Sequence, residues 1–166
     1  MENLYNELER ILCSEVEVHV AIVETAHALN KSLKENNIPE INSFTQRHDE
    51  QICQIEKLEE QRIEYSVLIA KKLGIKTKEP KLANLIENAP SSFKQRLCEL
   101  HSKLLKEINE LSKLTVSNQL LLENAMSIIN CTFAFIRQSQ KKYQPYSATR
   151  KTSSSYNAFT MFNRTV

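Results

Sequence analysis

Apolar side chains recur every three or four residues along most of this chain, which is the spacing of one face of an α-helix. The first such segment spans about residues 3–36 and stops at Asn36-Asn37-Ile38-Pro39, where the asparagines favour leaving a helix and proline cannot continue one. The second spans about 40–73 and stops at Gly74, a residue typical of helix ends. The connection is short, so the pattern predicts an antiparallel helical hairpin.

A third long helix is predicted over about residues 91–141, with Pro90-Ser91-Ser92 as its N-cap. Pro80 is expected to open a short linking helix over 80–87. The predicted fold is all-α: a long antiparallel hairpin plus a third long helix, forming an elongated bundle or coiled coil over residues 1–142. Residues 143–166 are predicted to be a loose tail that is flexible or folds on binding.

Asn118 falls on the apolar seam of the third helix. One interpretation is a partly exposed polar interruption. The other is a buried amide that fixes the register of the helix against its neighbours. The sequence leaves both open.

The composition argues against an enzyme. The chain has 166 residues but one glycine and no tryptophan, so a glycine-rich phosphate loop or a nucleophile elbow cannot be built. No catalytic residue, metal or cofactor is predicted. The four cysteines are scattered, which suggests free, buried or half-buried thiols. Because the start lacks a signal-peptide pattern and no apolar run approaches the ~18 residues of a membrane span, we expect a cytoplasmic protein without membrane insertion.

One set of residues fits metal binding and needs separate treatment. Glu24 and His27 have the Glu-x-x-His spacing of di-iron helical bundles, and a hairpin turning near Asn37 would place His27 opposite His48. The chain has no second Glu-x-x-His, so polar interruptions on helix seams explain these residues better than a metal site.

The charge balance changes after Glu123. No acidic residue follows it, while six basic residues do, and the preceding part holds 16 basic and 20 acidic residues. The tail combines serines and threonines with five aromatic residues. It fits a solvated end, or a segment that folds against a partner or its own bundle. Six charges over this length are too sparse to predict nucleic-acid or membrane binding.

Two motifs resemble a known family. Leu58-Glu59-Glu60-Gln61-Arg62 followed by Leu73-Gly74 is similar to the Leu-Glu-x-x-Arg … Leu-Gly signature that closes the second helix of the FlgN family. Asn118-Gln119-Leu120-Leu121-Leu122, followed by Ser127-Ile128-Ile129, is similar to its Asn-x-x-Leu-Leu run on the last long helix. The order of helices also agrees, over roughly residues 4–143.

The resemblance implies a flagellar type III export chaperone. It would bind the C-terminal helices of the hook–filament junction proteins, prevent their premature association and deliver them to the export gate and ATPase components. The family binds cargo through its C-terminal part, which here points to the stripe Leu122, Ile129, Phe133 and Ile136; these residues are equally compatible with packing on the hairpin. A tyrosine beyond the helix contacts the export gate in the family, and Tyr143 and Tyr146 are the matching positions.

Two alternatives remain from the residues alone. A structural or tethering coiled coil would use its apolar stripes only for self-association, for example as a homodimer. A metal-binding bundle centred on Glu24, His27 and His48 would carry metal when purified.

Overall fold

The computed structural model describes residues 1–75 and 80–142, with side chains as far as Gln138. Every regular element in this part is an α-helix, so the predicted all-α class is confirmed. The chain divides into two compact units, 1–128 and 129–166. The predicted tail, 143–166, lies outside the described residues, and its boundary with the bundle stays a prediction. The helices are α1 (Glu2–Glu35), α2 (Ile38–Leu73), α3 (Leu82–Glu87) and α4 (Ser91–Lys142).

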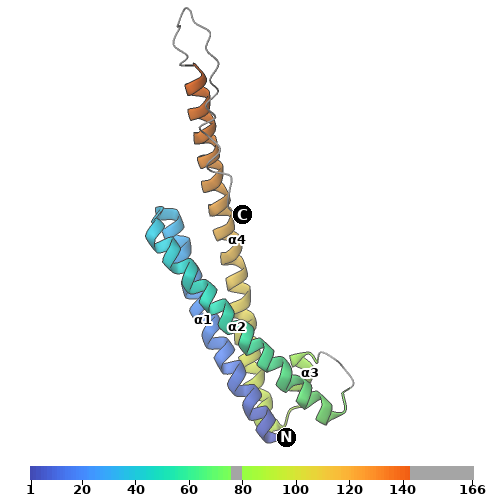
Figure 1. Cartoon of the computed structure of the whole chain (residues 1–166). Helices are drawn as coiled ribbons and strands as arrows, with labels where there is room; N and C mark the ends of the chain where they lie inside the picture. Colours follow the sequence, from blue (N-terminus) through green and yellow to red (C-terminus); the bar gives the residue numbers. More distant parts are fainter. Residues whose placement is uncertain (76–79, 143–166) are drawn as a thin grey trace, which may run out of the picture. The chain divides into compact units, whose positions relative to one another are not determined.

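The predicted hairpin of α1 and α2 is visible in the first unit (Figure 1). Asn36 ends α1 in the left-handed conformation, with φ 53°, and the backbone N–H of Asn37 donates to the carbonyl of Ser32 over 3.0 Å. The Asn37 side chain then accepts a hydrogen bond from the backbone N–H of Glu40, and Pro39 lies in the first turn of α2. The two asparagines therefore end one helix and start the next within two residues.

α2 ends as the sequence predicts. Gly74 has φ 75°, and the N–H of Ile75 donates to the carbonyl of Ala70 over 3.0 Å. One other helix start differs from expectation: α3 begins at Leu82, because Lys81 before it is extended. α4 begins at Ser91, as the sequence predicts, and the carbonyl of Pro90 accepts from the N–H groups of Phe93 and Lys94.

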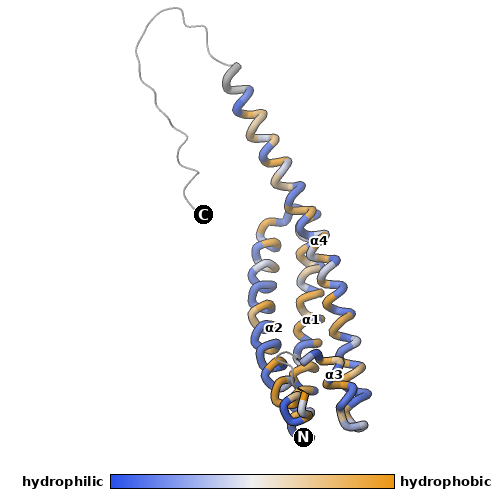
Figure 2. Tube along the Cα trace, turned by 90° about the vertical axis from the view of Figure 1, so that its right-hand side faces the viewer, coloured by the Kyte–Doolittle hydropathy of each residue, from blue (hydrophilic) through white to orange (hydrophobic). Residues whose placement is uncertain are grey.

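The hydrophobic core of the first unit lies near the N-terminus, where α1, α2, α3 and the start of α4 adjoin (Figure 2). Tyr5 is fully buried there and stacks on Phe93 with ring centroids 5.7 Å apart. Its hydroxyl donates to the carbonyl oxygens of Leu85 and Asn88, so the polar end of the ring is satisfied. The core comprises Tyr5, Leu8, Leu12, Ile69, Ala70, Leu85, Ile86, Phe93, Leu97 and Leu104.

Farther along the hairpin, the residues between the helices include polar ones that the apolar pattern does not predict. Gln51 and Ser66 are buried on α2, whereas the neighbouring apolar residue Ile52 is 37% exposed. α1 also buries Glu15, His19 and Asn30. Apolar periodicity therefore locates the helices correctly, but it does not identify all the residues of α2 that are buried.

Candidate functional site

A polar bridge joins α1 to α4 in the first unit. The side-chain N–H of Asn30 donates to Oδ1 of Asn118 over 2.7 Å and to Oγ of Ser117 over 3.0 Å. Asn118 Nδ2 in turn donates to the carbonyl oxygen of Ala26 over 3.1 Å, and Asn118 is only 6% exposed. Of the two interpretations of Asn118, the buried amide is therefore correct.

Asn118 is the last buried residue of α4 for which burial is described. Every residue from Met126 to Gln138 is exposed. Many of these side chains are large and apolar, which is unusual for the surface of a soluble protein and typical of an interaction site. Those with the largest exposed fractions are Met126, Ile128, Phe133 and Phe135, at 60–72%.

The four residues of the predicted cargo-binding stripe are all exposed in the structure. Leu122 is 46% exposed, Ile129 52%, Phe133 60% and Ile136 44%. They lie at helical spacings of seven, four and three residues along α4, so they share one face of this helix. Their role in binding stays a prediction. Tyr143 and Tyr146 lie outside the described residues.

The same part of α4 has one further property. Among the described helices, α4 contains an 18-residue stretch that is long and apolar enough to cross a membrane by length and composition, and none of that stretch is buried. The sequence pattern did not lead us to expect this, because Glu123, Asn124 and Asn130 interrupt the run of apolar residues. A single such helix does not indicate a membrane protein, but its composition shows how apolar this surface is.

The Leu-Glu-x-x-Arg motif on α2 joins the two hairpin helices. Arg62 Nε donates to Glu15 Oε1 over 3.0 Å, and its Nη2 donates to Glu59 Oε1 over 3.0 Å. The side chain of Glu15 is 4% exposed and that of Arg62 21%. Burial raises the pKa of Glu15 even though Arg62 opposes that shift. The arginine of the motif therefore compensates a buried carboxylate on the neighbouring helix.

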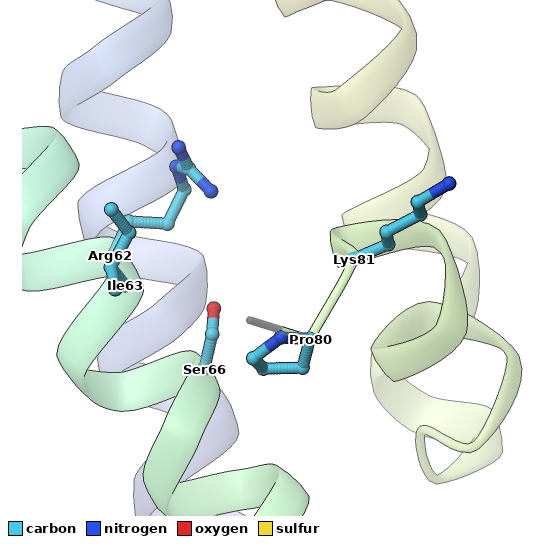
Figure 3. Close-up of a pocket in the computed structure, with 5 residues that line it drawn as sticks. All are labelled: Arg62, Ile63, Ser66, Pro80 and Lys81. Carbon is cyan, nitrogen blue, oxygen red and sulfur yellow. The ribbon is translucent and has the colours of Figure 1, made fainter. Parts of the chain in front are cut away.

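A small pocket of about 270 Å³ lies beside this ion pair, between α2 and the segment that precedes α3 (Figure 3). It is lined by Arg62, Ile63, Ser66, Pro80 and Lys81. The Lys81 side chain points away from Ser66, and the Arg62 guanidinium is already bound to two carboxylates. The pocket therefore offers no assembled set of catalytic groups.

The metal-site hypothesis gains no support from the described residues. Nε2 of His27 lies 3.9 Å from Oε1 of Glu110 on α4, a carboxylate that the hypothesis did not include. Within 1–75 and 80–142, no group of three or more His, Cys, Asp or Glu side chains is placed to hold a metal ion. The cysteine expectation was wrong in part: all four are free, but Cys53, Cys98 and Cys131 are exposed.

Comparison with protein-family models matches residues 1–154 to the FlgN protein. The chain belongs to the FlgN family. This match confirms the resemblance indicated by the two motifs and extends it over a slightly longer range of residues. Comparisons of the chain with curated proteins and with solved structures found no match.

Membership of the FlgN family makes this a flagellar export chaperone in general terms. FlgN-family proteins are soluble chaperones and not known enzymes, which agrees with the absence of a recognisable reaction centre in the sequence. Two residues of the family-like motifs make polar contacts between helices: Arg62 joins α2 to α1, and Asn118 joins α4 to α1. Sequence patterns did not identify their buried partners, Glu15 and Asn30. The sequence around a single polar residue in an apolar stripe does not show which residue it will bond.

Proposed function

We propose that this FlgN-family protein binds the C-terminal helices of the hook–filament junction proteins in the cytoplasm, through the apolar face of α4. It thereby prevents their premature association and delivers them to the flagellar type III export apparatus. The observation that carries the proposal is the exposure of Leu122, Ile129, Phe133 and Ile136 on a protein of a soluble chaperone family.

The mode of binding follows from the helical spacing of these residues. An amphipathic cargo helix that lies along α4 would bury its apolar face against theirs, which is helix-in-groove recognition. Each half-exposed side chain still has apolar area to remove from water. Phe133 is the aromatic residue among the four and has the largest exposed fraction. Aromatic side chains of this kind are frequent hot spots in interfaces. Phe133 is therefore expected to contribute most of the affinity.

Delivery requires a second contact, with the export gate or its ATPase components. Tyr143 and Tyr146 follow α4 directly in the sequence and match the position of the tyrosine that the family uses for this purpose. We assign them to the export contact on that ground alone.

A second candidate function is a tethering coiled coil that acts by self-association. The exposed apolar residues on α2 favour it, because a homodimer would also cover them: Ile52, Ile63, Val67 and Leu68 are 37–45% exposed. This alternative predicts a tight constitutive dimer and no binding to cargo.

Calorimetry with a peptide from the C-terminal helix of a junction protein tests the proposal. The full-length chain and a version ending at Gln140 are compared. Micromolar or tighter one-to-one binding by both supports a cargo site on α4 and leaves the tyrosines for the export contact. Binding by the full-length chain alone would move the cargo site to the tail. Absence of binding, together with a stable homodimer, would overturn the proposal in favour of the tether.

A further inference from the structure

The charge of α4 is distributed unevenly along its length. From Ser91 to Glu123 the helix carries five basic and four acidic residues, so the two signs nearly balance. From Asn124 to its end it carries three basic residues and no acidic one. The basic residues are Arg137, Lys141 and Lys142.

The dipole of the helix accounts for only part of this pattern. Lys141 and Lys142 lie in the last turn, where cations stabilise any helix. Arg137 lies outside that turn, is exposed, and follows Phe133 by four residues, so it borders the apolar face directly. Arg137 thus places a positive charge beside the exposed ring of Phe133, and this half of the helix carries no acidic residue. Such a surface is complementary to a negatively charged partner.

We propose that the segment bound on this face is an amphipathic helix whose polar edge is acidic, an inference that rests on the proposed function. Charge complementarity also argues against two other occupants. The tail of the chain adds Arg150, Lys151 and Arg164 without an acidic residue, so its own charge opposes docking here. A second copy of the same half-helix would bring like charges together, which disfavours a homodimer through this face.

An anionic membrane is the other surface that combines apolar and negative groups. Helices that lie on membranes usually carry rows of lysine and arginine on the polar face. Here that face holds neutral groups instead, including Asn124, Ser127 and Asn130, all of them exposed. The observations therefore favour a protein helix over a lipid surface.

The test uses the full-length chain and two synthetic helical peptides with the same apolar stripe, one with glutamates and one with lysines along its polar edge. At low salt we expect the glutamate peptide to bind about tenfold more tightly, because each exposed ion pair changes affinity by a few-fold. The preference is expected to shrink as salt is raised. Arg137→Glu should reduce or reverse it. Lys113→Glu, the same charge change on α4 but on the part before Glu123, should leave it unchanged.

The outcomes separate this inference from the proposed function. Equal binding of both peptides, unaffected by salt or by Arg137→Glu, would overturn the acidic edge and leave a purely apolar cargo site. Failure of both peptides and of junction-protein helices would overturn the proposed function itself. Binding to vesicles containing phosphatidylglycerol that is lost in Arg137→Glu, with no peptide bound, would overturn the inference in favour of a membrane surface.

Discussion

The side-chain amide of Asn30 donates to the side-chain carbonyl oxygen of Asn118 over 2.7 Å, although the two residues are 88 positions apart in the chain. Both are buried, at 8% and 6% exposure. A one-residue shift of α4 along α1 would break this bond and the bond from Asn118 to the carbonyl of Ala26. The pair therefore fixes the register of α4 at the end of its buried stretch, immediately before the apolar face proposed to bind cargo.

Asn118→Leu is expected to lower the free energy of unfolding by about 1–3 kcal/mol, because it leaves the buried Asn30 amide with one partner fewer. Urea denaturation followed by circular dichroism measures this. The double variant Asn30→Leu/Asn118→Leu should recover most of the loss, since no buried amide then remains there. Asn124→Leu, at an exposed position of the same helix, should change the stability little. An Asn118→Leu protein as stable as wild type would contradict the role of the pair.

Arg62→Ala is expected to be much more destabilising than Glu59→Ala. Removing Arg62 leaves Glu15 as a buried, uncompensated carboxylate, at a cost of about 3 kcal/mol. The side chain of Glu59 is 55% exposed, and losing its pair with Arg62 should cost at most about 1 kcal/mol. Denaturant midpoints of the two variants provide the comparison. Equal effects would show that the Arg62–Glu15 contact does not compensate a buried charge.

The raised pKa of Glu15 predicts a pH dependence with a definite sign. The folded state binds this proton more readily than the unfolded state, so burial of the charged form lowers stability above the raised pKa. That cost disappears as the pH falls toward the ordinary value of 4.5. Wild type should therefore gain stability relative to Glu15→Gln as the pH is lowered from 7 to 5. The prediction would be refuted if the stability difference between the two proteins stayed constant or changed in the opposite direction.

Gly74→Ala should destabilise the protein by about 1–2 kcal/mol, because Gly74 has φ 75°, where a Cβ is unfavourable. No atom lies within 4 Å of the Cβ that alanine would add, so the cost is conformational rather than steric. Asn36→Gly is the matched variant, since Asn36 ends α1 at φ 53° and glycine adopts this conformation without strain. It should be neutral or slightly stabilising. The melting temperatures of both variants test this expectation. An unchanged melting temperature of Gly74→Ala would argue against a strained left-handed cap at the end of α2.

Much of the fold can be predicted from local sequence signals. Asn37 and Pro39 mark the hairpin turn, and Gly74 marks the end of α2, because their backbone preferences act within a few residues. The buried polar contacts are different, since Glu15 and Arg62 are separated by 47 residues and their pairing depends on how the helices pack. Apolar periodicity likewise places Leu122 and Phe133 on one helix face, but it cannot distinguish a face packed on the hairpin from one exposed to solvent.

The most direct test of the cargo site is calorimetry of the variant Leu122→Ala/Ile129→Ala/Phe133→Ala/Ile136→Ala with a junction-protein helix. Its control changes four exposed apolar residues of α2 to alanine, which at 37–45% are somewhat less exposed than the four on α4: Ile52, Ile63, Val67 and Leu68. We expect the α4 variant to lose more than tenfold in affinity with little change in melting temperature, because its side chains are exposed and alanine preserves the helix. The control should bind as wild type does. Unchanged affinity in the α4 variant would contradict the central claim that this face of α4 binds the cargo.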